Sequence, residues 1–152
     1  MPGFKDFMYT VLRLGEVASG AVVAGTIGQY LSEYYRTFGE AQAIYTEVVA
    51  AISILTGLIG PFAGSITWPL DIILCLAWFA SFGALFRALA DFNCDGSYVD
   101  NFGGPITNCA RWKAGESFAF ISGFLWLVTS VLGVISWTQQ RTKQRQGGKS
   151  AA

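Results

Sequence analysis

The chain has 152 residues, of which 53% are hydrophobic and only 13% are charged, whereas soluble domains carry roughly 25% charged residues. Ten basic and ten acidic residues give zero net charge, which argues against a nucleic-acid partner, because such binding needs a strongly basic surface. Histidine is absent, so the commonest general base and the commonest transition-metal ligand are both missing.

Four apolar stretches, each close to the length that crosses a bilayer, account for most of the chain. About 20 helical residues span the hydrocarbon layer of roughly 30 Å. A soluble domain of this size has too little interior to surround four such helices. We therefore predict an all-α fold, an integral membrane antiparallel four-helix bundle over residues 1–138. The predicted spans are about 11–32, 46–66, 69–90 and 116–138.

The polar, basic segment 139–152 follows the last span, and we expect it to be disordered. Its basic side chains are Arg141, Lys143, Arg145 and Lys149. They would attract anionic lipid of the inner leaflet at about 1 kcal/mol per charge near the surface. The alternative is that they form the ordinary topogenic cluster beside a last span.

Orientation follows from the Lys and Arg residues near the span ends. With both termini in the cytoplasm, six basic residues lie inside and four outside. The inner six are Lys5, Arg13, Arg141, Lys143, Arg145 and Lys149, and the outer four are Arg36, Arg87, Arg111 and Lys113. The bias favours two cytoplasmic termini.

This orientation places Cys94 and Cys109, both in the long segment before the fourth span, in an oxidising compartment. A disulfide between them would brace the second extracytoplasmic loop and contribute roughly 3 kcal/mol in the chain-entropy model. The alternative, two free thiols, requires the opposite topology or a reducing environment. Cys75 lies within the third span, where we expect a small packing residue.

The first span is rich in small residues, which are Gly20, Ala21, Ala24, Gly25 and Gly28. Pairs four residues apart, such as Ala21 with Gly25, allow two helix backbones to approach closely. The alternative is that glycine is simply common in membrane helices. The sequence does not decide between them.

Charged residues lie at the predicted edges of the spans, where charge costs less than at the bilayer centre. Arg13, Glu16 and Asp71 fall at the cytoplasmic edge, and Glu47 and Arg87 at the outer edge. Arg13 and Glu16, three residues apart, are expected to pair on one helix face. Glu47 and Arg87 have similar depth on neighbouring helices and could pair across the bundle. Structural anchoring is the favoured interpretation, and a transport role is the alternative.

Five tryptophans divide by depth. Trp68 and Trp137 are expected in the inner headgroup belt, and Trp112 is expected in the outer one. Trp78 and Trp126 lie deeper, where they are expected to pack inside the bundle or face lipid.

Four local features resemble the MARVEL family of four-span proteins, and in particular its fungal members. Leu12-Arg13-Leu14 and Glu16 open a glycine-rich first span, and Thr67-Trp68-Pro69-Leu70-Asp71 enters the third. Cys94 and Cys109 bracket an outer loop. Arg111-Trp112-Lys113-Ala114, Glu116 and Phe118-Ala119-Phe120 then lead into the fourth span. The resemblance covers about residues 8–138.

The resemblance implies membrane organisation, vesicle trafficking or residence in sterol-rich or sphingolipid-rich plasma-membrane domains, such as fungal eisosomes. No catalytic residue, metal ligand or cofactor motif is identified, so we expect a non-enzymatic protein without a cofactor. Bound sterol, sphingolipid or phospholipid, a homo-oligomer or lateral array, and other membrane-protein partners are the expected associations. The plasma membrane and secretory vesicles are the expected locations. The alternative function is a small oligomeric channel or transporter.

Overall fold

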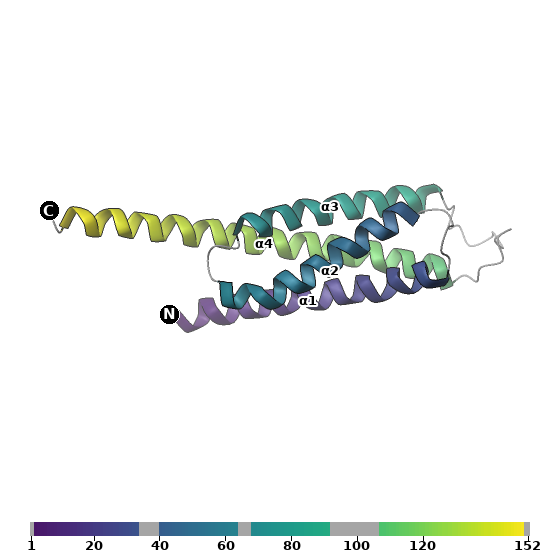
Figure 1. The fold of residues 1–152 in the computed structure, drawn as a ribbon, viewed down its shortest axis with the longest axis horizontal. Helices are drawn as coiled ribbons and strands as arrows, with labels where there is room; N and C mark the ends of the chain where they lie inside the picture. Colours follow the sequence, from purple (N-terminus) through teal and green to yellow (C-terminus); the bar gives the residue numbers. More distant parts are fainter. Residues whose placement is uncertain (1, 34–39, 64–67, 92–106, 151–152) are drawn as a thin grey trace.

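Four long helices form the structure, a computed structural model that describes residues 2–33, 40–63, 68–91 and 107–150 (Figure 1). They are α1 (Pro2–Glu33), α2 (Glu40–Ala63), α3 (Trp68–Asp91) and α4 (Thr107–Ser150). Each contains a stretch long and apolar enough to cross a membrane, and these stretches are Phe7–Ser32, Glu40–Gly60, Trp68–Ala90 and Arg111–Gln146. The prediction of an all-α fold with four potential membrane spans is confirmed.

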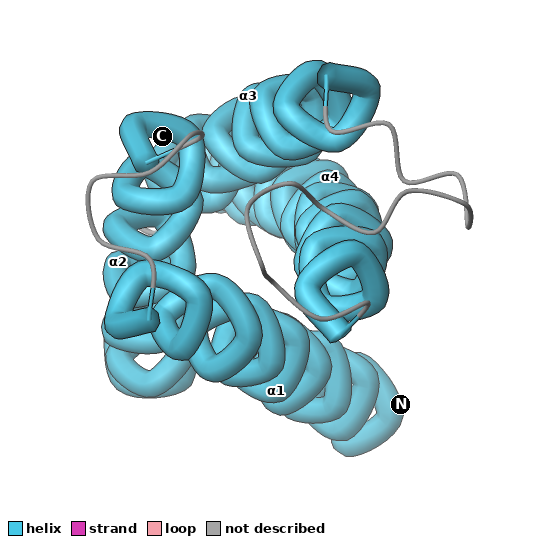
Figure 2. Tube along the Cα trace, turned by 90° about the vertical axis from the view of Figure 1, so that its right-hand side faces the viewer, coloured by secondary structure: helices cyan, strands magenta, loops and turns pink. Residues whose placement is uncertain are grey.

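The helices lie side by side around one long axis, and each contacts two neighbours (Figure 2). The contacting pairs are α1 with α2, α2 with α3, α3 with α4, and α4 with α1. Gly57, late in α2, faces Val17 early in α1, while Gly28, late in α1, faces Glu47 early in α2. Across the α3–α4 pair, the first residue of α3, Trp68, faces Gly133 far along α4.

The distribution of side chains differs from that in a soluble bundle. Many large apolar side chains point outward, and Leu14, Ile73 and Leu76 each expose more than 60% of their surface. Inside, an apolar core that includes Trp78, Leu85 and Trp126 is accompanied by many buried polar side chains. The buried polar side chains are Arg13, Glu16, Ser19, Thr46, Ser53, Asp71, Ser81, Ser122, Thr129 and Ser130. Apolar surface all around a helical bundle is stable in lipid but not in water. This arrangement agrees with the four spans.

The terminal segment differs from the expectation of disorder. α4 continues without a break through residues 139–150, and the side chains from Gln139 to Gln146 are exposed. In Figure 1 this part of α4 extends past the ends of the other helices. Gln, Arg and Lys are good helix formers. Because the preceding span has already nucleated the helix, each further residue adds one hydrogen bond, which explains the extension.

The cysteines fall on different parts of the chain. Cys94 lies outside the described residues, and the side chain of Cys109 is not described either, so their disulfide stays a prediction. Cys75 is a buried free thiol that donates to the Gly123 carbonyl oxygen at 3.6 Å. This contact between α3 and α4 agrees with the packing role expected for Cys75.

Close packing of α1 against α2 generates a first prediction. A Cβ at Gly57 would lie 2.5 Å from Cγ2 of Val17, and a β-branched valine has little rotamer freedom in a helix. We expect Gly57→Ala to lower the free energy of unfolding by about 1–3 kcal/mol, the usual range for overpacking. The measurement is thermal or SDS unfolding of the purified protein in detergent.

Gly25→Ala is the matched control, because a Cβ at Gly25 meets nothing within 4 Å. This variant should be neutral or slightly stabilising, as alanine favours helix over glycine. Equal destabilisation by the two variants would contradict the close approach of α1 and α2 at Gly57.

Candidate functional site

Arg13 is the centre of a buried charge cluster near one end of the bundle. Its side chain is only 2% exposed. One terminal nitrogen donates to Oε2 of Glu16 at 3.0 Å, and the other donates to Asp71 Oδ1 and Oδ2 at 2.8 and 2.9 Å. Because α1 and α3 are not neighbours in the ring of helices, the Arg13–Asp71 ion pair crosses the interior of the bundle.

Two aromatic rings and a glycine fix the guanidinium of Arg13. Tyr9, one turn earlier in α1, accepts hydrogen bonds from Nε and Nη2 at 3.1 and 2.8 Å. The guanidinium carbon lies 5.0 Å from the centre of the Trp126 ring of α4, a cation–π contact. A Cβ at Gly60 of α2 would lie 3.0 Å from Arg13 Nε, so the space for the guanidinium depends on this glycine.

Glu16 extends the cluster to α4. It is fully buried, and its second carboxylate oxygen accepts a hydrogen bond from the hydroxyl of Thr129. The cluster therefore joins side chains of α1, α3 and α4, while α2 provides the space at Gly60. Breaking a buried ion pair by removing one partner typically costs about 3–5 kcal/mol, because the remaining charge is left without compensation.

Further polar contacts connect the helices deeper in the bundle. Ser122 of α4 donates to Ser19 of α1 at 2.9 Å, and the indole nitrogen of Trp78 in α3 donates to Ser53 of α2 at 2.9 Å. Lipid tails are as apolar as leucine, so burying apolar side chains supplies little net attraction between helices in a membrane. Hydrogen bonds, close backbone contacts and van der Waals packing of the core hold the bundle together instead.

The structure tests two expected charge pairs. The Arg13–Glu16 pair is confirmed at 3.0 Å. The Glu47–Arg87 pair is wrong: Arg87 is exposed on α3, and Oε2 of Glu47 has no hydrogen-bond partner. The carboxylate of Glu47 instead lies against Gly28 of α1. A Cβ added at Gly28 would lie 3.4 Å from Oε1 of Glu47, so the absence of a side chain there leaves room for the carboxylate. Similar depth on two helices does not ensure that two side chains face each other.

The small residues of α1 divide between two environments. Gly20 packs against Ile54 of α2, and Gly28 packs against the carboxylate of Glu47. Ala21 and Gly25 are exposed, and Ala24 is half-buried. The pair Ala21 and Gly25 therefore lies on the outer surface of the bundle rather than between its helices.

The tryptophans also depart in part from expectation. Trp78 and Trp126 are fully buried, which selects packing over contact with lipid. Trp112, expected in an outer headgroup belt, is only 3% exposed and lies edge-on to Tyr30 at 5.1 Å. Trp68 and Trp137 lie together with ring centres 5.5 Å apart, and the Arg141 guanidinium lies 4.1 Å from the centre of the Trp137 ring.

Sequence reasoning missed several residues that build the cluster. Tyr9, Gly60 and the contact between Asp71 and Arg13 were not anticipated. Ser122 and Thr129, seven residues apart in an apolar helix, do share one face at helical spacing. Polar residues on one face of a membrane helix indicate contact with other helices, so this signal was present. Within the described helices, no three His, Cys, Asp or Glu side chains are grouped to hold a metal ion.

The chain matches a known protein family. The model of the MARVEL family, described as a membrane-associating domain, matches residues 7–132. This range contains all three charged members of the cluster. A search of curated proteins found no match to the chain.

The charge cluster generates a second prediction. We expect Arg13→Met to lower the free energy of unfolding by about 3–5 kcal/mol, because Glu16 and Asp71 then remain buried without a cation. The triple variant Arg13→Met, Glu16→Gln, Asp71→Asn should recover most of this loss, since no unpaired charge is left. Reversible unfolding of both proteins in mixed micelles measures the difference. A triple variant no more stable than Arg13→Met would contradict the electrostatic explanation.

Proposed function

Since the chain belongs to the MARVEL family of membrane-associating domains, we propose that it organises membranes without enzymatic activity. It does so by lateral assembly with itself and with lipids, as a multi-pass protein of the plasma membrane or secretory vesicles. This role resembles that of the fungal eisosome-associated members of the family. The observation that carries the proposal is the combination of a buried charge cluster, which ties the helices together, with an apolar outer surface on every helix.

The orientation of the chain is part of the proposal. The ion pair between Arg13 and Asp71 joins the early parts of α1 and α3. The contact between Trp68 and Trp137 places the late part of α4 beside the start of α3. These contacts support an antiparallel bundle with both termini at one end, and the excess of Lys and Arg near that end favours the cytoplasmic side. A Cys94–Cys109 disulfide would then brace the loop on the opposite side.

Self-association is assigned to the outer face of α1. Ala18, Ala21 and Gly25 are exposed there, at spacings of three and four residues. A Cβ at Gly25 would meet nothing within 4 Å, so the helix backbone is accessible to another helix. Small residues at this spacing allow two membrane helices to approach closely. Lateral contact through α1 would leave the intramolecular contacts of Gly20 and Gly28 with α2 unchanged.

If the protein associates with itself through α1, the variant Gly25→Leu should weaken this self-association. The larger side chain would separate the two backbones, and we expect the association constant in liposomes to fall about tenfold, equivalent to about 1.4 kcal/mol. Single-molecule photobleaching of labelled protein at known protein-to-lipid ratios gives the constant.

Gly83→Leu is the matched control, since a Cβ at Gly83 on α3 also meets nothing within 4 Å. It should leave the association constant unchanged. A wild-type protein that is monomeric at all protein-to-lipid ratios would refute self-assembly. Equal weakening by both variants would refute its assignment to α1.

A channel or transporter is the second candidate, and the oxygen of Glu47 that lacks a hydrogen-bond partner is the observation that favours it. Against it, the Thr26 and Thr56 hydroxyls donate to carbonyl oxygens of their own helices at 2.9 and 2.8 Å. These hydroxyls therefore contribute little to a polar path. We expect liposomes containing the protein to show no specific ion or solute flux. A flux abolished by Glu47→Gln would contradict the membrane-organising proposal.

A further inference from the structure

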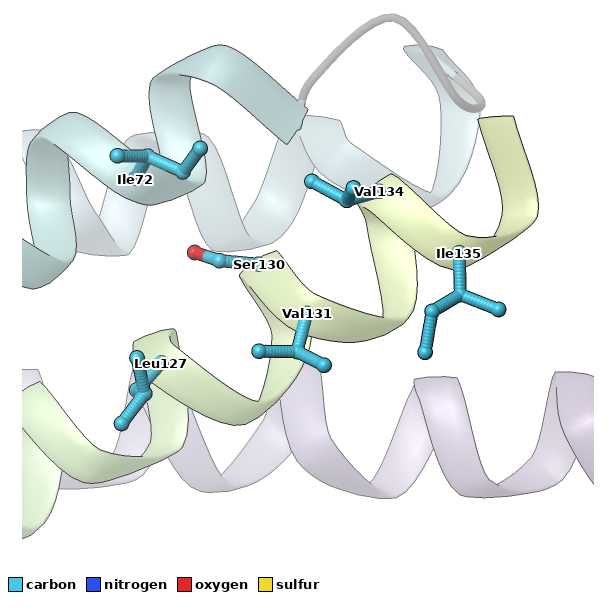
Figure 3. A pocket seen from close by; sticks show the side chains of 6 residues that line it. All are labelled: Ile72, Leu127, Ser130, Val131, Val134 and Ile135. Carbon is cyan, nitrogen blue, oxygen red and sulfur yellow. The ribbon is translucent and has the colours of Figure 1, made fainter. Parts of the chain in front are cut away.

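An apolar groove of about 320 Å³ lies on the outer surface between α3 and α4 (Figure 3). Its walls are Ile72 of α3 and Leu127, Ser130, Val131, Val134 and Ile135 of α4. The α4 residues from Leu127 to Ile135 extend over about 12 Å along the helix axis. Leu127, Val131 and Ile135 are each 41–50% exposed, so the groove is open to the surroundings of the bundle.

The chemistry of the groove fits a hydrocarbon chain. Five of its six lining side chains are aliphatic, and the sixth, Ser130, donates its hydroxyl proton to the Trp126 carbonyl oxygen at 2.6 Å. Because that proton is already engaged within α4, the groove offers no hydroxyl donor to a polar ligand. A ligand with a flexible apolar part therefore fits better than one that must be recognised by hydrogen bonds inside the groove.

Polar recognition is available just beyond one end of the groove. Trp68 lies one helical turn before Ile72 in α3, and Trp137 lies about one turn after Val134 in α4. The centres of the two tryptophan rings are 5.5 Å apart. Gly133 permits this contact, because a Cβ there would lie 2.9 Å from Cβ of Trp68. Tryptophans of this kind mark the headgroup level of a bilayer. The groove then occupies the adjacent acyl-chain layer.

Arg141 supplies a fixed positive charge at this level. Its guanidinium lies 4.1 Å from the centre of the Trp137 ring, and the helical rise places it about 9 Å beyond Ile135. Residues 134, 138 and 141 share one helix face, so Arg141 is in line with the groove. A guanidinium presents several N–H donors that match the oxygens of a phosphate. Charge and apolar surface are thus arranged in the order of a phospholipid headgroup and its chain.

We propose that this groove binds one acyl chain of an anionic glycerophospholipid whose phosphate is held by Arg141. The site would give the protein a specific lipid contact in addition to the general attraction of its basic tail for anionic lipid. The proposal rests on the proposed position of the bundle in the bilayer and does not require lateral self-assembly. A sterol fits less well, because its hydroxyl carries no negative charge to pair with Arg141.

Native mass spectrometry of the full-length protein in detergent micelles tests the site. The probes are phosphatidylserine and phosphatidylcholine with identical acyl chains, and the bound lipids are counted on the monomer. The wild-type protein should retain one phosphatidylserine in preference to phosphatidylcholine. Arg141→Gln should weaken phosphatidylserine binding about fivefold, as expected for one charge near a membrane surface. It should weaken phosphatidylcholine binding less, because the choline group already neutralises the charge of that phosphate. Lys143→Gln, the control in the same tail but on another helix face, should have no such effect.

A second pair of variants tests the groove itself. Val131→Trp fills it and should abolish the preferential retention of phosphatidylserine. Leu132→Trp adds the same side chain at the neighbouring position, which is exposed but outside the groove, and should retain the lipid. All four substitutions lie on the exposed surface. Circular dichroism should therefore show unchanged helix content.

Four results would overturn the proposal. These are lipid retention by Val131→Trp equal to wild type, equal effects of Arg141→Gln and Lys143→Gln, equal affinity for the two phospholipids, and displacement of phosphatidylserine by cholesterol. Photobleaching separates this proposal from self-assembly. A monomeric wild-type protein that still shows the expected lipid pattern would refute assembly and support the lipid site. An assembling protein without the pattern would do the opposite.

Discussion

The ion pair between Arg13 and Asp71 is the constraint on which the rest of the structure depends. It is the contact that joins α1 to α3 across the interior, since these helices are not neighbours in the ring. In hydrocarbon surroundings each of these charges requires a partner. Any rotation of α1 or α3 that separated them would expose a charge to lipid. The pair therefore fixes how both helices are turned about their axes, and Glu16 with Thr129 carries the same constraint to α4.

The membrane surroundings explain why so many polar side chains are buried while large apolar ones remain outside. A membrane protein gains little from burying leucine, because its alternative environment is equally apolar. Beside its apolar core the bundle buries hydroxyls, one indole hydrogen bond and the charge cluster, and it places glycines where helices approach most closely. Many large apolar side chains remain outside, where lipid would cover them. The outer surface is consequently free to differ from helix to helix, with small residues on α1 and a lined groove between α3 and α4.

Hydropathy was sufficient to predict the four helices, because span length and the bilayer thickness are directly related. Local spacing was sufficient for the Arg13–Glu16 pair, since residues three apart share a helix face. Neither source of information gives the rotation of a uniformly apolar helix. For that reason the sequence placed Asp71 at the correct end of the bundle without identifying Arg13 as its partner. The same gap produced the wrong Glu47–Arg87 pair. The helical continuation past Thr138 was missed because composition alone describes a polar segment and ignores the nucleated helix before it.

The most direct test of the account is an accessibility scan of α1 by electron paramagnetic resonance, with single spin labels from residue 14 to residue 28 in liposomes. Oxygen, which concentrates in hydrocarbon, should collide most often with labels at Leu14, Ala18, Ala21 and Gly25, at least when self-association is diluted out. Labels at Ser19 and Val23 should show minima, and a water-soluble nickel complex should not reach Ala18, Ala21 or Gly25. Oxygen accessibility without helical periodicity, or free access of the nickel complex to Ala21 and Gly25, would contradict a bundle surrounded by lipid.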